Sequence, residues 1–260
     1  MNDKDILNSL RRDILDAGYN SKEGHIPSAY SILEIVYGFY KNLNKNKLTG
    51  TDEINLDKFV LSKGHGALAL YAVLAEFGYF SKDWINNFAS FNSDFGGHPD
   101  RLKVSGVEAS TGSLGHGIAI AAGMAYAQKI RSTKARVFCL IGDGELNEGT
   151  IWETLLVASQ HKLNNFIVIV DQNHSSDRAI NPTSLTSKFE SFGFVTNEID
   201  GHNLDDIKNI YVENSSGEAP KAFIAETIKG KGLEEMENNP AWHHKFPNQV
   251  EYENFLGQLK

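Results

Sequence analysis

Two short apolar runs of this sequence are each followed by side chains that carry oxygen. Residues 137–141 lead into Gly-Asp-Gly, with Asp143 at its centre, and residues 166–170 lead into a segment that contains Asn173. Carboxylate and amide oxygens are hard ligands that suit Mg²⁺ or Ca²⁺. A helix predicted to begin near Gly149 directs its N-terminal N–H groups toward the same region, which favours a phosphate. The pattern therefore predicts a site for a cation and a phosphate.

The Gly-Asp-Gly segment has two other interpretations. A tight strand-to-helix turn with ordinary surface carboxylates explains the motif alone about as well. An EF-hand calcium loop does not fit, because its sixth position needs glycine and is Glu148, and its twelfth needs a bidentate glutamate and is Thr154. Glu148 stands at the start of a predicted helix, where the helix dipole favours a carboxylate, so we assign it a structural role.

Histidines stand beside glycines more often than composition alone predicts. Nine histidines and 23 glycines in 260 residues give about 0.8 Gly-His pairs by chance. The sequence has five such pairs, at 24–25, 64–65, 97–98, 115–116 and 201–202. A single loop histidine more often makes a structural hydrogen bond than does chemistry, and His161, His174 and His202 keep that interpretation.

An alternation of helices and strands must position these side chains. Helices are predicted at 3–17, where Gly18 stops the helix, and at 28–43, 65–77, 114–129, 149–162, 203–212 and 251–259, with a further helix capped by Ser81. Strands are predicted at 59–61, 137–141, 166–170, 195–199 and 222–226. Strands without polar alternation imply an α/β fold, a doubly wound parallel sheet with helices on both faces. Such sheets bind ligands at the carboxyl ends of their strands, where Asp143 and Asn173 then converge.

Composition limits the class of protein. A chain of 260 residues, 41% hydrophobic, can fill the core of one large domain over residues 1–260. A net charge of −8 without a basic patch argues against a nucleic-acid partner, and no apolar run approaches the roughly 20 residues that cross a membrane. Cys139 is alone, which excludes an internal disulfide, and its apolar neighbours predict a buried, inert thiol. The charged first residues do not resemble a signal peptide, so we expect a cytoplasmic protein.

Six stretches, in order along the chain, resemble the N-terminal part of transketolase, a thiamine-diphosphate enzyme. The family's cofactor motif, Gly-Asp-Gly followed at a distance by Asn, is matched by residues 142–144 and Asn173, with 28 residues between Gly144 and Asn173. The other five stretches are Gly-His-Ile-Pro-Ser at 24–28, Leu-Ser-Lys-Gly-His-Gly at 61–66, Gly-Gly-His-Pro-Asp at 96–100, Ser-Thr-Gly-Ser-Leu-Gly at 110–115 and Pro-Ala-Trp-His at 240–243. Each stretch is weak alone, but six in order are specific.

The resemblance implies a Mg²⁺ site that holds the cofactor's diphosphate. Its protein ligands would be Asp143, Asn173 and the backbone carbonyl of Ser175, and diphosphate oxygens and water would complete the octahedron. Because the diphosphate brings negative charge to a chain already at −8, a divalent cation is needed. The family usually has an apolar residue at the position of Ser175, so an apolar contact from that side chain to the cofactor is in doubt.

The resemblance also implies roles for glycines and histidines around the cofactor. The segment 112–114 would pass under the aminopyrimidine. His25 and His98 would line the channel over the thiazolium and hydrogen-bond substrate hydroxyls, with His243 sharing that catalytic work. Neutral histidines can move protons near pH 7 without adding permanent charge. The implied cofactor-binding residues are His65, Gly112, Ser113, Leu114, Gly144, Asn173 and His243.

The resemblance covers only the diphosphate-binding half of a transketolase. In the family, the glutamate that protonates the aminopyrimidine lies in the next domain, and no glutamate here fits that role. We therefore expect the diphosphate-binding subunit of a two-subunit transketolase, which is inactive without a separate pyrimidine-domain subunit. We expect the enzyme to contain two copies of each chain. The implied reaction transfers a two-carbon ketol unit from a ketose or ketose phosphate to an aldose or aldose phosphate through the cofactor's C2 carbanion.

Two alternatives and one departure stay open. The chain fits a subunit of another thiamine-diphosphate enzyme, either decarboxylating a 2-oxo acid or of the deoxyxylulose-phosphate type, although the histidine set argues against it. A non-catalytic, Mg²⁺-dependent cofactor-binding subunit is the second alternative. His244 and Phe246 stand where the family commonly has small residues, so their bulk would change which sugar fits if they face the channel. The resemblance places Glu148 near a subunit interface.

Overall fold

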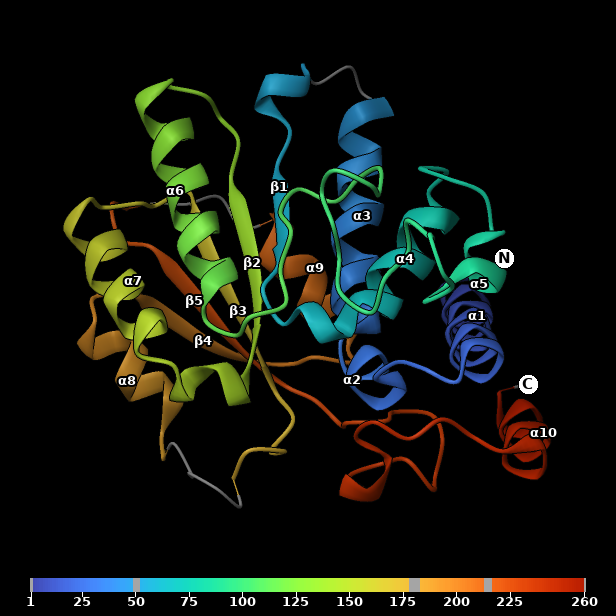
Figure 1. Ribbon diagram of the computed structural model, residues 1–260. Helices are drawn as coiled ribbons and strands as arrows, with labels where there is room; N and C mark the ends of the chain where they lie inside the picture. The colour runs from blue at the N-terminus through green and yellow to red at the C-terminus, as the bar shows by residue number, and fades with distance from the viewer. Residues whose placement is uncertain (1, 49–51, 178–182, 213–216, 260) are drawn as a thin grey trace.

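A parallel sheet forms the centre of the computed structural model, which describes residues 2–48, 52–177, 183–212 and 217–259 (Figure 1). Within these residues the sheet has five strands in the order β1-β2-β3-β5-β4, and every neighbouring pair is parallel. The predicted α/β fold with a parallel sheet is confirmed. The strands are β1 (Lys58–Leu61), β2 (Val137–Gly142), β3 (Phe166–Gln172), β4 (Val195–Asp200) and β5 (Lys221–Glu226).

Both faces of the sheet are covered, which explains why its central strands lack polar alternation. Along β2, Phe138 and Leu140 join one buried apolar cluster, whereas Val137, Cys139 and Ile141 join the other. Successive side chains of a strand point to opposite faces, so each face of β2 needs apolar residues. Cys139 is fully buried, as predicted, and its burial raises the pKa of the thiol.

Helices from both halves of the chain cover the first face. The helix α3 packs against α4 and α9, and α1 lies outside them against α4 and α5 (Figure 1). The short α2 contacts α4, and α10 lies beside α1. Their bounds are α1 (Asp3–Ser21), α2 (Ile26–Tyr30), α3 (Leu33–Leu48), α4 (Ala67–Glu76), α5 (Trp84–Asn87), α9 (Leu204–Val212) and α10 (Gln249–Gln258).

Three helices cover the second face, namely α6 (His116–Ile130), α7 (Gly149–Gln160) and α8 (Leu185–Ser191) (Figure 1). Their buried residues form one cluster with the odd-numbered side chains of β2. Short 3₁₀ turns stand at Glu53–Asn55, Gly64–Gly66, Asp143–Asn147 and Pro240–Trp242. Among the described residues, no helix combines the length and the apolar character needed to cross a membrane.

Three of the predicted helix signals are wrong. Gly18 does not stop the first helix but lies buried inside it, because a Cβ there would come within 2.6 Å of the Ile26 side chain. The helix predicted at 28–43 is broken into α2 and α3 near Ser31, whose hydroxyl bonds the Ser28 carbonyl. Ser81 caps no helix, since its hydroxyl donates to Asp83, just before α5. The helix α8 was not predicted.

Candidate cofactor site

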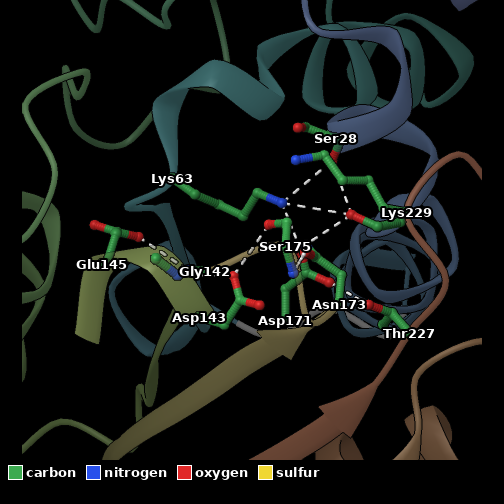
Figure 2. Close-up of polar contacts among 12 residues, drawn as sticks. Ser28, Lys63, Gly142, Asp143, Glu145, Asp171, Asn173, Ser175, Thr227 and Lys229 are labelled. Carbon is green, nitrogen blue, oxygen red and sulfur yellow. Dashed lines mark hydrogen bonds and ion pairs between the residues drawn. The ribbon is translucent and has the colours of Figure 1, made fainter. Parts of the chain in front are cut away.

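The three predicted metal ligands lie together at the carboxyl edge of the sheet. Asp143 directly follows β2 and Asn173 directly follows β3, and these two strands are neighbours, as predicted. The Ser175 hydroxyl lies 3.4 Å from Oδ1 of Asp143, and the Ser175 N–H donates to Oδ1 of Asn173 at 3.1 Å. Figure 2 shows the three side chains around one point. Their role as metal ligands stays a prediction.

Asp143 has the features of a carboxylate that expects a cation. The residue is 4% exposed, and its Oδ2 has no hydrogen-bond partner among the described residues. Its Oδ1 accepts from the Gly144 N–H at 2.7 Å. Burial, together with the negative charge of Asp171, raises the pKa of Asp143. A buried oxygen without a partner is costly, and a bound cation would satisfy it.

The remaining donors suit Mg²⁺ held partly by its ligand. Among the described residues, no group of three or more His, Cys, Asp or Glu side chains stands ready to bind a metal. Mg²⁺ commonly takes only one or two carboxylates, and phosphate oxygens complete its shell. The Gly144 position is also open, since a Cβ there would meet no described atom within 4 Å. The residues present therefore fit a magnesium diphosphate.

A buried ion pair that the sequence did not reveal orients Asn173. The Asn173 amide donates to Oδ2 of Asp171 at 2.7 Å, which turns its oxygen away from Asp171. Asp171 is fully buried and pairs with the Lys63 ammonium and the Thr227 hydroxyl. Burial alone would raise the pKa of Asp171, but Lys63 holds it below the usual value. The available signal was a carboxylate inside an apolar strand, which needs a buried partner.

Glu145 joins three loops beneath the site and was also missed. Its carboxylate accepts from the Gly142 N–H at 3.0 Å, the Gly115 N–H at 2.8 Å and the Ser62 hydroxyl at 2.7 Å. These partners belong to the end of β2, the start of α6 and the loop after β1. Glu145 is 1% exposed, and burial raises its pKa despite the three donors. It therefore fixes the turn that presents Asp143 (Figure 2).

Lys229 brings a positive charge to the same edge of the sheet. Its ammonium lies 2.9 Å from Nδ1 of His243, and both line a cavity of about 270 Å³ with Asn173 and Ser175. An ammonium only donates, so Nδ1 of His243 accepts and its Nε2 carries the hydrogen. Burial, and then the charge of Lys63, lowers the pKa of Lys229 to about 8. Its place just after β5, at the ligand-binding edge, was the signal that could have identified it.

Four of the predicted histidines gather around His25. Its ring centroid lies 5.4 Å from that of His65 and 5.4 Å from that of His243. Burial lowers the pKa of His25 to about 4 and that of His65 to about 2, and it also lowers the pKa of His243. His98 is near enough to contribute to the low pKa of His25. The cluster is therefore uncharged at pH 7.

The segment 110–115 passes directly beside His98. A Cβ on Gly112 would approach the His98 ring to 3.3 Å, so this contact requires glycine. The Thr111 hydroxyl donates to the Leu61 carbonyl at 2.6 Å and ties the segment to the end of β1. Ser113 and Leu114 follow at partly exposed positions before α6. Their contact with a cofactor stays a prediction.

The other histidines divide between structure and site. His202 has a structural role, as predicted, since its Nε2 accepts from the Ile228 N–H at 2.9 Å and its Nδ1 lies 3.1 Å from Glu34. His174 bonds Asp177 and Glu226, each at 2.9 Å, but also lines the cavity beside Lys229. His244 faces the histidine cluster, with its ring centroid 4.5 Å from that of His25.

Comparison with known proteins identifies the family. The model of the family "Transketolase, thiamine diphosphate binding domain" matches residues 2–247. The chain therefore belongs to the transketolase thiamine-diphosphate-binding domain family. The predicted family, the transketolase type of transferase and thiamine diphosphate as the cofactor are confirmed at this level.

The chain is similar to relatives of two lengths. It is 36% identical over 258 residues to an apulose-4-phosphate transketolase subunit of Actinobacillus succinogenes, which covers 97% of this chain and 94% of the relative. It is also 36% identical to Homo sapiens transketolase, covering 93% of this chain but only 39% of that protein. Transketolase from Campylobacter jejuni has a similar structure, with a TM-score of 0.88 and 29% identity, covering 100% of this chain and 43% of that one.

Proposed function

We propose that this chain is the diphosphate-binding subunit of a two-subunit transketolase. The enzyme transfers a two-carbon ketol unit from a ketose or its phosphate to an aldose or its phosphate. The observation that carries the proposal is the meeting of Asp143, Asn173 and Lys229 at one sheet edge beside an uncharged histidine cluster. These groups suit a magnesium diphosphate on one side and a polyhydroxylated substrate on the other.

The same residues would hold the cofactor. Mg²⁺ would be bound by the unpartnered Oδ2 of Asp143, Oδ1 of Asn173 and the Ser175 carbonyl. The diphosphate would lie against Gly144, His65, His243 and Lys229, and the aminopyrimidine would lie over Gly112, Ser113 and Leu114. When bound, thiamine diphosphate supplies the nucleophilic carbon that cleaves the ketose and carries the two-carbon unit.

The histidines then act on substrate hydroxyls. Lys229 donates to Nδ1 of His243, which leaves the Nε2–H of His243 free to donate to a substrate oxygen. His25 is kept neutral by burial and by its cationic or protonatable neighbours, so it can accept or donate a proton without a charge to remove first. We assign the catalytic contacts to His25, His98 and His243.

A separate pyrimidine-domain subunit would complete the site. The relatives of matching length are named as subunits of a transketolase, whereas this chain covers 39% of the human enzyme. Residues 1–260 would be one diphosphate-binding domain, and the second half of the cofactor site would come from the partner. This assignment explains why a transketolase-like site stands in a chain without the family's N1′ glutamate.

Two copies of this chain would meet through α6 and α7. Large apolar side chains are exposed there, with Leu156 at 59% and Val157 at 54%, beside an open apolar cavity of about 350 Å³. Glu148, which the family resemblance places near a subunit interface, packs at the start of α6, since a Cβ on Gly115 would come within 2.7 Å of it. The apolar face is continuous with that expected interface.

Reconstitution tests the proposed function. The purified chain, a candidate partner with the pyrimidine domain, and the mixture of the two are each assayed for ketol transfer with thiamine diphosphate and Mg²⁺. We expect turnover only in the mixture. Full turnover by this chain alone would reject the two-subunit proposal, release of CO₂ from pyruvate would favour another thiamine-diphosphate chemistry, and cofactor binding without turnover in any complex would favour a non-catalytic subunit.

A further inference from the structure

A pair of charged and polar side chains borders the histidine cluster. Nε2 of His244 lies 2.8 Å from Oε1 of Glu23, and the two residues are separated by 221 positions in the chain. Glu23 lies in the loop between α1 and α2, two residues before His25, and His244 follows the 3₁₀ turn Pro240–Trp242. The side chains of His244 and Glu23 are 52% and 44% exposed, so both remain accessible to a ligand.

The position of this pair places it beside the reacting end of the site. The His244 ring centroid is 4.5 Å from that of His25, closer than the rings of His65 or His243. The charge of His244 is also the largest contribution, after burial, to the low pKa of His25. Any substrate that reaches His25 therefore passes within contact range of His244.

The hydrogen bond to Glu23 determines what His244 can recognise. The bond to His244 is the main reason that the pKa of Glu23 lies below its usual value, so the carboxylate is charged near pH 7. A carboxylate only accepts hydrogen bonds, hence Nε2 of His244 carries the hydrogen and Nδ1 of the neutral ring is an acceptor. An acceptor backed by a negative charge favours a hydroxyl donor and disfavours a phosphate or carboxylate.

We propose that His244, held by Glu23, is a specificity-determining residue that accepts a hydrogen bond from one hydroxyl of the sugar and rejects an anionic group at that point. The inference rests on the proposed ketol transfer and names its substrate class, which is a polyhydroxylated aldehyde that is uncharged at the carbon facing His244. The cation of the site, Lys229, contacts His243 instead, so the cofactor's anionic group and this hydroxyl contact have separate partners.

A substrate-by-variant cycle tests the hydroxyl contact. The reconstituted two-subunit enzyme is assayed with one ketose donor and with D-ribose or its monodeoxy analogues as acceptors. In the wild type we expect one deoxy analogue to lose about tenfold in kcat/KM. The His244→Ala variant should lose the same factor with D-ribose, mainly through KM, and should no longer distinguish the two acceptors.

A charge variant and a matched control complete the experiment. Glu23→Gln keeps the shape of the pair and removes the charge, so we expect kcat/KM for the anionic acceptor glyoxylate to rise several-fold relative to D-ribose. Lys245→Ala is the control, because Lys245 anchors the same segment through Glu251 at 2.6 Å but does not contact His25. A segment that merely positions the loop would make Lys245→Ala reproduce the effect of His244→Ala.

The outcomes separate the two proposals. A wild-type complex that transfers no ketol unit would reject the proposed function and this inference with it. An active wild type whose His244→Ala variant still distinguishes D-ribose from every deoxy analogue would overturn the inference alone. An unchanged glyoxylate preference in Glu23→Gln would overturn the charge argument. Thermal unfolding of each variant confirms that the chain is folded.

Discussion

Asp143 has opposite consequences for folding and for binding. The protein leaves its Oδ2 buried and unpartnered among the described residues, which destabilises the fold, while the same oxygen gives the site its strongest cation ligand. Lys229 shows a similar conflict, because its partly buried ammonium has a lowered pKa but offers the positive charge that an anion needs. At the scale of residues, the site stores unfavourable interactions that a bound magnesium diphosphate would relieve.

Replacing Asp143 tests this opposition directly. We expect Asp143→Asn to raise the dissociation constant for thiamine diphosphate at least about 100-fold in the presence of Mg²⁺. The same variant should raise the free energy of unfolding of the cofactor-free chain by about 1 kcal/mol, since an amide is cheaper to bury than an unpaired carboxylate. Titration calorimetry measures the first effect and urea denaturation the second. Weaker binding together with a less stable chain would indicate a structural role instead.

Lys229 predicts how cofactor affinity depends on pH. Its pKa of about 8 means that it is protonated at pH 7 and loses its charge as the pH rises through about 8. A neutral amine attracts a diphosphate less, so affinity should fall between pH 7 and pH 9.5. Calorimetry across this range measures the fall, and Lys229→Arg should remove most of it because arginine stays charged. A pH-independent affinity in the wild type would contradict a contact between Lys229 and the diphosphate.

At the scale of elements, the Lys63–Asp171 pair joins four parts of the fold. Lys63 follows β1, Asp171 lies in β3, Thr227 follows β5, and Ser31 stands between α2 and α3. Each element contributes one polar group to a buried network, and the network in turn orients Asn173. The break between α2 and α3 belongs to the same arrangement, because it brings Ser31 to the carboxylate.

A double-variant cycle separates the stabilising and the orienting roles of this pair. Lys63→Met should lower the free energy of unfolding by about 3–5 kcal/mol, since it leaves the Asp171 carboxylate buried without its counter-ion. Adding Asp171→Leu should recover most of that loss, because two apolar groups replace two charges. Cofactor affinity should stay low in the double variant, since Asn173 has lost the acceptor that orients it. Chemical denaturation and calorimetry measure the two quantities, and recovered affinity would contradict the orienting role.

At the scale of the whole molecule, local patterns predicted the sheet better than the site. The strands at β2 and β3 are buried on both faces, so their apolar runs identify them, and their adjacency brought Asp143 and Asn173 together as predicted. Glu145 and the Lys63–Asp171 pair were missed, because each joins segments more than 25 residues apart and no local spacing encodes such a pairing. Gly18 misled for the related reason that a distant side chain, not a helix end, requires it.

The face formed by α6 and α7 governs assembly of the whole molecule. Leu156 is 59% exposed on α7, and a charge there would be buried without a partner if two copies meet at this face. We expect Leu156→Glu to weaken self-association by about 100-fold, which corresponds to the few kcal/mol that such a burial costs. Val250→Glu on α10 is the matched control, since Val250 is 77% exposed and lies far from this face (Figure 1). Light scattering coupled to size exclusion measures the mass of each variant. An unchanged assembly in Leu156→Glu, or equal dissociation in Val250→Glu, would place the contact between copies elsewhere on the molecule.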